Sequence, residues 1–389
     1  MNKNRRYAIL GLLSLVIMTS ITTVIILSAV GLFLTDIPGI GSISKDDIDF
    51  FAKFLAYKNL LKETYYEEVD MKKVYDGALH GMADAVGDQY TMYLEQDENT
   101  VLMEDLDSKY TGLGIYVGIS AKDNKIVVMD FVDESPAKEA GVEVNDKIIK
   151  VDGVEYDGDT LDDAVSHMKG TIGETVKLTI LRKDEELEVD VVRREINIKS
   201  IEFENKSGIG YIKIVKFDNN VAKSFDEAYD TLRSENIGSL IIDVRDNGGG
   251  VYDEVVKIAK RIIPEGLIVY TVDKEGKKEE EKSSGIGIDI PLVVLTNEYS
   301  ASASEIFAGA VKARGCGTLV GTKTYGKGVV QGVYEMNDGT AMKITIAKYY
   351  TPDDVCIDGT GIEPDVLVED NIRTTKDEQL EKALSILKK

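Results

Sequence analysis

Residues 291–331 read PLVVLTNEYSASASEIFAGAVKARGCGTLVGTKTYGKGVVQ. The run from Leu292 to Leu295 is continuously apolar and too short for a helix, which predicts a strand buried on both faces. A polar turn follows, and a helical pattern with Ile306 and Phe307 on one side then continues to Gly315. The stretch therefore predicts a strand, a tight turn and a helix, an arrangement in which nucleophilic hydrolases often expose a serine hydroxyl.

Ser302, at the start of this helix, has two interpretations. The pattern Ser302-x-x-Glu305 fits a capping box, in which a serine and a glutamate each accept a hydrogen bond from an otherwise unpaired backbone N–H. Caps are much commoner than nucleophiles, so the serine taken alone favours a cap. The two roles are compatible, because a helix dipole also stabilises negative charge at that position.

The chain offers lysine rather than histidine as the base for such a serine. Its two histidines are His80, in an amphipathic stretch near the N-terminus, and His167, in a segment assigned below to a binding module. Neither adjoins the serine motif, which makes a Ser-His-Asp arrangement unattractive. Lys327, between two glycines, is the alternative base, since lysine replaces histidine in some serine proteases. A lone loop lysine, however, is more commonly a solvated surface residue.

The serine and lysine motifs together resemble those of the carboxyl-terminal processing (tail-specific) serine proteases. The similarity lies in residues 300–306 (SASASEI) and 326–331 (GKGVVQ), and it extends from about residue 45 to the C-terminus. It implies that Ser302 is the nucleophile, that Lys327 is its base, and that Gln331 holds the lysine. For Lys327 to act at neutral pH, its pKa must fall from about 10.4 through burial without a carboxylate partner.

A glycine-rich loop, residues 246–250 (DNGGG), follows a predicted buried strand and precedes a helical pattern. Such loops collect backbone N–H groups that bind an anion. Nucleotide phosphate is one candidate, but neither a P-loop motif nor GxGxxG occurs. The family resemblance implies instead that Gly249 and Ala303 donate their N–H groups to the oxyanion of the reaction. Three consecutive glycines leave the register of Gly249 open.

Between residues 106 and 194 the sequence changes to short strands and turns that resemble a PDZ domain. The resemblance implies that the N–H groups around Gly112, Leu113 and Gly114 bind the carboxylate of a chain terminus. The bound peptide would then add as a strand beside the one that starts at Ile115. A plain tight turn is the alternative explanation of the two glycines.

Two positions of this module depart from the family pattern. Asn145 replaces a glycine, which is tolerable because asparagine accepts left-handed backbone dihedrals. Lys169 stands where relatives commonly carry an arginine. If that arginine links the module to the catalytic core, the link is weaker here, because lysine cannot make two parallel hydrogen bonds to a carboxylate.

Composition excludes some classes of partner. Lys and Arg number 46 and Asp and Glu 69, a net charge of −23 that argues against a nucleic-acid partner. The only cysteines are Cys316 and Cys356, and no CxxC or His/Cys cluster occurs, so neither a metal nor another cofactor is predicted. Whether the two thiols pair is open, because sequence does not show their distance.

The N-terminus predicts a membrane anchor. Lys3, Arg5 and Arg6 precede 28 uncharged residues, 7–34, more than the ~20 that cross a bilayer. We interpret them as an uncleaved single-pass signal-anchor, with its basic end in the cytoplasm and the residues after Asp36 outside the cell membrane. A cleaved signal peptide is the alternative.

The expected fold class is multi-domain α/β. Residues 1–36 form the cytoplasmic stub and transmembrane helix, 37–105 a helical region, 106–194 an inserted, mainly-β PDZ domain, and 195–389 an α/β serine-protease core with a C-terminal helix. By resemblance the helical region would form a homodimer; a packing spacer is the alternative.

The predicted function is a membrane-anchored serine endopeptidase with a Ser-Lys dyad. It would bind the C-terminal tail of extracytoplasmic proteins through its PDZ domain and cleave a peptide bond near that tail. Two alternatives remain: a catalytically inactive PDZ scaffold, and an α/β hydrolase that acts on small acyl substrates.

Overall fold

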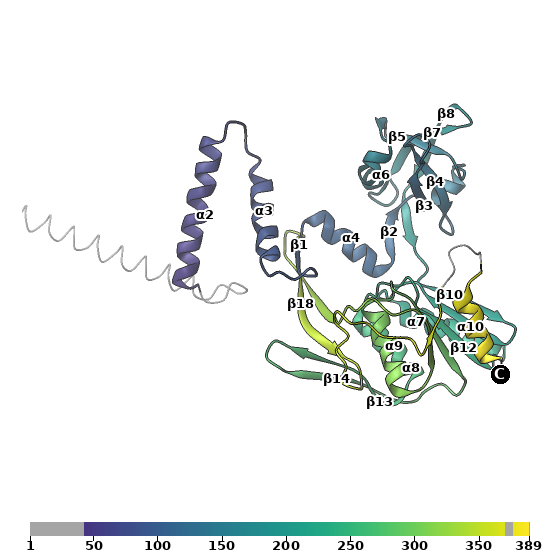
Figure 1. Ribbon diagram of the computed structural model, residues 1–389. Coiled ribbons are helices and arrows are strands. Elements are labelled where there is room, and N and C mark those ends of the chain that lie inside the picture. The colour runs from purple at the N-terminus through teal and green to yellow at the C-terminus, as the bar shows by residue number, and fades with distance from the viewer. Residues whose placement is uncertain (1–42, 370–375, 389) are drawn as a thin grey trace, which may run out of the picture. The chain divides into compact units, whose positions relative to one another are not determined.

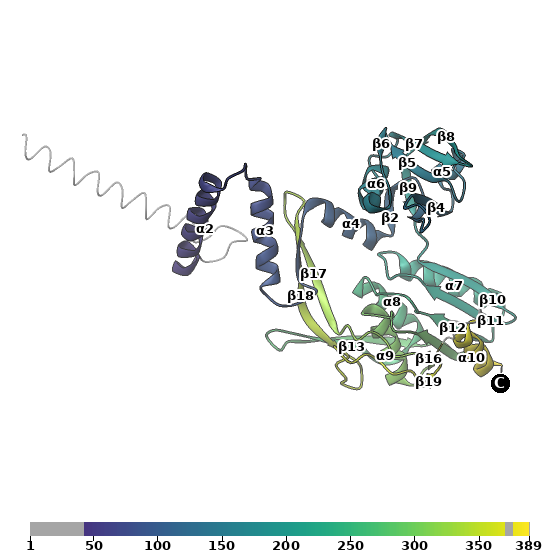
Figure 2. The same cartoon turned by 45° about the horizontal axis from the view of Figure 1, so that its top comes forward.

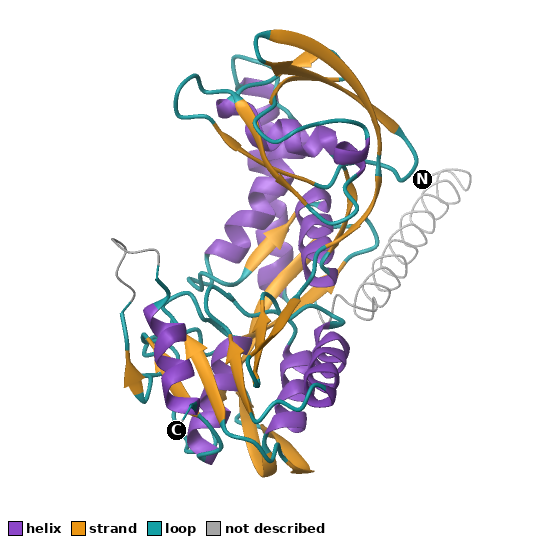
Figure 3. Ribbon diagram, turned by 90° about the vertical axis from the view of Figure 1, so that its right-hand side faces the viewer, coloured by secondary structure: helices purple, strands orange, loops and turns teal. Residues whose placement is uncertain are grey.

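The computed structural model describes residues 43–369 and 376–388. These residues form both helices and strands (Figure 3). The described part of the chain divides into two compact units, with the boundary between Ala78 and Leu79. The predicted signal-anchor lies outside the described residues. Among the helices that the structure describes, none has both the length and the apolar composition needed to cross a membrane.

The first unit contains α2 (Lys45–Thr64) and the first half of α3 (Met71–Asp84). A capping box begins α2: the Asp47 N–H donates to the Ser44 hydroxyl at 3.1 Å, and the Ser44 N–H donates to the Asp47 carboxylate at 2.7 Å. The apolar residues of α2 are not buried; Phe50 is 61% exposed and Phe51 59%.

The second unit is organised around a six-stranded sheet in the order β10-β11-β12-β15-β16-β19. The β10–β11 pair is antiparallel, and each following pair is parallel. The strands are β10 (Ile201–Lys206), β11 (Ile209–Ile214), β12 (Ser239–Asp243), β15 (Leu292–Thr296), β16 (Thr318–Gly321) and β19 (Val366–Leu367).

Helices cover both faces of this sheet (Figure 1). The helices are α7 (Val221–Ser234), α8 (Tyr252–Ile262) and α9 (Ala303–Arg314), which share one apolar core with the sheet, and α10 (Glu378–Leu387), which packs on the other face. Every residue of β15 is buried, which confirms the strand predicted from its unbroken apolar run. The helix that follows ends at Gly315, in the left-handed conformation at φ 61°, as predicted.

A second sheet packs against this core (Figure 2). The loop that contains Lys327 leads directly into one of the strands of this sheet. Its strands are β1 (Met92–Leu94), β13 (Pro264–Asp273), β14 (Lys278–Ile286), β17 (Val329–Glu335) and β18 (Ala341–Tyr350). The sequence predicts helix throughout 37–105, but residues 92–94 form a strand. They do so because they pair with the long strand β18 and bury Tyr93 and Leu94, so tertiary pairing overrides the local helical pattern. Helix α4 (Gln96–Asp107) follows.

The segment that resembles a PDZ domain has a hydrophobic core of its own. Its sheet contains β3 (Ile115–Ile119), β4 (Ile126–Phe131), β5 (Lys147–Val151), β7 (Thr175–Arg182) and β8 (Glu185–Val192) in that order, with β6 (Val154–Glu155) beside β5 and the helices α5 (Pro136–Glu139) and α6 (Leu161–Met168). The ribbon of β2 (Lys109–Gly112) and β9 (Arg194–Asn197) joins its two ends. Asn145 has φ 74°, the left-handed conformation expected of it.

A charged network attaches α10 to the central sheet. Arg245 follows β12 and donates from Nη2 to Asp243 at 2.6 Å and to Asp377, at the start of α10, at 2.8 Å. The Asp243 side chain is almost fully buried. Because a buried carboxylate needs its donors, this arginine stabilises both the strand end and the docked helix.

We expect Arg245→Lys to lower the free energy of unfolding by about 2 kcal/mol, because lysine cannot bond both carboxylates in this fork geometry. Urea unfolding measures the loss. Arg261→Lys, which changes an exposed arginine paired with Asp230, is the control and should change stability by less than about 0.5 kcal/mol. Equal stability of the two variants would contradict this role of Arg245.

Candidate active site

Ser302 lies in a strained turn between β15 and α9. Its backbone angles are φ 54° and ψ −112°, a conformation that is rare outside glycine and that persists only where neighbours hold it. The Tyr349 hydroxyl donates to the Ser302 carbonyl oxygen at 3.1 Å, and the Ser302 N–H donates to the Glu305 carboxylate at 2.9 Å. The serine thus precedes the first residue of α9, and the hydrogen bond from its N–H to the glutamate is one of the two that the predicted capping box requires.

Glu305 connects this turn to the loop of Lys327. Its side chain is fully buried, and it accepts hydrogen bonds from the N–H of Gly326 at 2.7 Å, the N–H of Lys327 at 2.8 Å and the hydroxyl of Thr324 at 2.6 Å. Burial raises the pKa of Glu305, and these hydrogen bonds oppose the rise. One carboxylate therefore sets the positions of two segments that are distant in sequence.

Tyr349, on β18, makes a second connection between the same segments. Its hydroxyl lies within hydrogen-bond distance of the carbonyl oxygens of both Ser302 and Lys327, so one proton is shared between two acceptors. The ring is only 1% exposed, which restricts the movement of both carbonyl groups.

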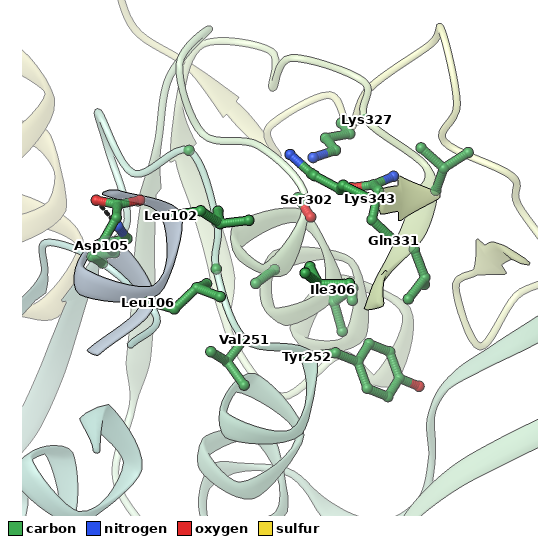
Figure 4. Close-up of a pocket in the computed structure, with 18 of the residues that line it drawn as sticks. Leu102, Asp105, Leu106, Val251, Tyr252, Ser302, Ile306, Lys327, Gln331 and Lys343 are labelled. Atoms are coloured by element: carbon green, nitrogen blue, oxygen red, sulfur yellow. Dashed lines mark ion pairs between the residues drawn. The ribbon is translucent and has the colours of Figure 1, made fainter. Parts of the chain in front are cut away.

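Lys327 is half-buried, and its ammonium lies 4.6 Å from the centre of the Tyr90 ring. Burial lowers the pKa of Lys327 and the nearby Lys343 lowers it further, whereas Asp88 and Glu305 oppose the shift. Figure 4 shows Lys327, Lys343 and Ser302 around one cavity. Within the described residues, no hydrogen bond joins the Lys327 amine to the Ser302 hydroxyl.

Gln331 lies in the same cavity, and among the described residues no hydrogen bond joins its amide to Lys327, so its predicted role in holding the lysine stays a prediction. Its Nε2 donates instead to the hydroxyl of Thr345, at 3.3 Å. Both residues belong to the β17–β18 hairpin, and this contact across the strands determines the direction of the amide.

The cavity has a volume of about 660 Å³ and brings together the predicted catalytic and oxyanion residues: Ser302, Ala303, Lys327, Gln331 and Gly249. Much of the remaining wall is apolar and comes from several elements: Leu102, Leu106, Val251, Tyr252, Ile306, Val329, Val330 and Val333. Such a cavity accepts an apolar side chain beside the serine. Neither histidine lines it.

The glycine loop approaches the serine turn closely. A Cβ on Gly249 would lie 2.8 Å from the Cβ of Ser302, and its φ is 107°, so only glycine fits there. The Gly249 N–H, however, donates to the Asn247 side chain at 2.9 Å and is not free for an oxyanion. The N–H groups of the exposed neighbours Gly248 and Gly250, and that of Ala303, have no acceptor among the residues that the structure describes.

Asn247 is a site residue that the sequence did not reveal. It is fully buried; its Nδ2 donates to the Ile214 carbonyl at 2.7 Å, and its own carbonyl accepts from the Ala301 N–H at 3.0 Å and the Ser304 hydroxyl at 2.8 Å. The role of Tyr349 was also missed. The one available signal for Asn247 is that a polar residue stands within a glycine-rich turn, and for Tyr349 that a polar residue stands within a strand.

The predicted peptide-binding residues lie in the PDZ-like module, outside the cavity. Leu113 is buried, Gly114 has φ 68°, and the strand that begins at Ile115 is at the edge of its sheet. Lys169 forms an ion pair of 2.6 Å with Glu104 on α4. The two cysteines are free thiols.

Two bacterial relatives identify the family. A probable CtpA-like serine protease of Staphylococcus haemolyticus (strain JCSC1435) is 35% identical over 334 residues, which are 85% of this chain and 67% of the relative. A protein of the same description from Staphylococcus aureus (strain COL) is 33% identical over 361 residues, 92% of this chain and 72% of the relative.

This chain belongs to peptidase family S41. Residues 208–368 match that family, residues 112–192 match the PDZ domain, and residues 38–98 match the N-terminal domain described for the activating protease CtpB. The resemblance seen in the sequence is thereby confirmed.

Solved structures agree with this assignment. The photosystem II D1 C-terminal processing protease is 26% identical with a TM-score of 0.51, and the match covers 88% of this chain and 98% of that one. A putative S41 protease from Bacteroides fragilis NCTC 9343 shares the fold at 15% identity and a TM-score of 0.55, with 85% and 96% of the two chains covered.

We expect Glu305→Gln to destabilise this S41 peptidase by about 3 kcal/mol, because the amide group would face N–H donors that need an acceptor. The serine and lysine segments would also shift, and a displacement of about 1 Å lowers turnover by about 100-fold. Urea unfolding and peptide cleavage measure the two effects. Glu298→Gln, on the exposed turn before Ser302, is the control; similar losses in both variants would argue against the buried carboxylate as the cause.

Proposed function

We propose that this S41 peptidase is an endopeptidase that uses Ser302 as nucleophile and Lys327 as general base. The observation that carries the proposal is the joint support of these two residues by one buried carboxylate and one buried hydroxyl, those of Glu305 and Tyr349. A loop lysine without a catalytic role would not require its backbone to be fixed against a strained serine turn.

In the proposed reaction, the neutral amine of Lys327 leaves the Tyr90 ring and takes the proton of the Ser302 hydroxyl. The oxygen then attacks the scissile carbonyl carbon, and a C–O bond forms. The Lys327 ammonium returns the proton to the leaving amine as the C–N bond breaks, and water releases the acyl group by the same steps. Gln331 would orient the amine once its amide turns from Thr345.

The oxyanion of the tetrahedral intermediate would be held by backbone N–H groups. Ala303 supplies one from the first turn of α9, where the helix dipole favours negative charge. Because the N–H of Gly249 is occupied by Asn247, we assign the second donor to a neighbouring glycine, Gly248 or Gly250. This proposal differs by one residue from Gly249, the donor that the family resemblance implies, whose register the sequence leaves open.

The PDZ domain would select the substrate by its C-terminal tail. The free edge of β3 can accept a peptide as an added strand, and the turn at Gly112–Gly114 can receive the terminal carboxylate. Cleavage would then occur at a bond that reaches the apolar cavity beside Ser302. This arrangement favours unstructured tails over folded segments.

We also propose that residues 7–34 anchor the enzyme in the cell membrane with its catalytic part extracytoplasmic, because this stretch is uncharged, mostly apolar and follows a basic start. Membrane fractionation and protease accessibility of intact cells test this. A homodimer through the helical region is a further proposal, which sedimentation of the detergent-solubilised protein tests.

We expect Ser302→Ala and Lys327→Ala each to lower cleavage of an unstructured peptide by at least about 100-fold, measured with the full-length protein. In the wild type, kcat/KM should rise with pH through the pKa of Lys327, because only the neutral amine accepts a proton. Burial lowers this pKa, so the rise should be centred below about 10.4.

Lys323→Ala, an exposed lysine of the same loop, is the matched control and should cleave as the wild type does. Full activity in both site variants would refute the dyad. No cleavage by the wild type would favour the inactive scaffold, and hydrolysis of small esters without peptide cleavage would favour the acyl hydrolase.

We expect amidation of a substrate's C-terminus to raise KM by about 10-fold or more with little change in kcat, because the PDZ domain loses hydrogen bonds to a charged group. Paired peptides that differ only in a free or amidated terminus measure this. Equal KM values would show that the tail carboxylate is not recognised.

A further inference from the structure

Lys343 is a second lysine in the active-site cavity, and neither the proposed reaction nor the substrate-binding scheme uses it. It lies on β18, opposite Val333 of β17, and is half-buried. It lines the same cavity as Ser302 and Lys327, and Figure 4 shows the three side chains at this cavity.

Lys343 has no carboxylate within ion-pair distance among the described residues. Lys216, which lines the same cavity, is paired with Asp105. In a chain with a net charge of −23, a half-buried lysine beside another lysine without a neutralising partner is unexpected. Its ammonium therefore contributes an uncancelled positive charge to the space around Lys327.

An uncancelled charge there acts on the protonation of Lys327. Two ammonium groups in a partly desolvated cavity repel each other, which disfavours the charged form of the more strongly desolvated one. A neighbouring cation is one of the known means by which an enzyme obtains a reactive lysine amine.

The other groups that face Lys327 favour its charged form. The Tyr90 ring attracts the ammonium, and the carboxylates of Asp88 and Glu305 do the same. The charge of Glu305 is already opposed by four hydrogen-bond donors. Burial and Lys343 disfavour the charged form of Lys327. Their combined effect is larger than that of the groups that favour it, so the pKa of Lys327 is lowered.

We infer that Lys343 is a positioning residue that acts through Lys327: its ammonium, in the same cavity, disfavours the charge of the neighbouring amine and so increases the fraction of that amine able to accept the Ser302 proton. The inference rests on the proposed Ser302–Lys327 reaction. Lys343 itself takes no proton from the substrate or the nucleophile.

The test is the pH dependence of kcat/KM for a peptide substrate, measured with full-length wild type, Lys343→Met and Lys343→Arg. Methionine keeps most of the length of the side chain but removes the charge. In this variant we expect the rise of activity to move to higher pH by about one unit. At pH 7 the rate should fall about 10-fold, while KM and the activity plateau at high pH remain unchanged.

Lys343→Arg keeps the charge and should follow the wild-type profile. Lys213→Met is the matched control, because Lys213 is a half-buried lysine on β11 that does not line the cavity and has no ion pair among the described residues. Its replacement should leave the pH profile of kcat/KM unchanged. Thermal unfolding shows whether each variant is folded. If Lys343→Met does not fold, the same shift is required of Lys343→Gln.

Three outcomes would overturn the inference: an unshifted profile in the folded, uncharged variant, an equal shift in Lys343→Arg, or a rise in KM without a shift. The last would show that Lys343 binds a substrate carboxylate instead. These results are separable from failure of the proposed function, because Lys327→Ala would still be inactive. If Lys327→Ala cleaves as the wild type does, the proposed base itself is refuted.

Discussion

The buried carboxylate of Glu305 is the interaction on which the site depends. Four donors surround it: the N–H groups of Ser302, Gly326 and Lys327 and the hydroxyl of Thr324. A carboxylate is stable in a dry interior only if its acceptor positions are filled, so displacement of either backbone segment would leave a costly unpaired charge. The electrostatic requirement of one side chain thereby defines the relative position of the serine turn and the lysine loop.

The amine has the opposite requirement. Lys327 can serve as a base only if its charge is disfavoured. The lysine is partly buried and shares its cavity with Lys343, and no ion-pair partner of its own lies among the described residues. The carboxylate that holds the loop contacts the lysine through its backbone N–H, not through the ammonium. One residue thus combines a backbone fixed by a carboxylate with an amine that this carboxylate does not bond.

The PDZ domain is inserted into the chain without interrupting the central sheet. The chain leaves the core after α4 and returns at β10, and a buried hydrogen bond of 3.0 Å joins the hydroxyls of Ser108 and Ser200 at the two crossings. Ser200 also donates to the buried Asp218 of the core. Lys169 adds a single ion pair with Glu104, where an arginine could have bonded both carboxylate oxygens.

Local patterns in the sequence determined much of this protein. The apolar run of β15, the glycine that ends α9, the left-handed Asn145 and the motifs of the S41 family are local features, because they follow from dihedral preferences and from side chains close together along the chain. Local pattern was insufficient for residues 92–94, which are a strand only because β18 offers a partner.

Only the tertiary structure decided which groups meet. The contacts of Asn247 with Gly249, of Tyr349 with both Ser302 and Lys327, and of Gln331 with Thr345 depend on hydrogen bonds between segments that the sequence cannot place side by side. The same is true of Lys343, for which the described residues offer no ion-pair partner and whose place in the cavity only the fold shows. A lysine looks the same in any sequence; its protonation depends on what the fold brings near it and on what the fold keeps away.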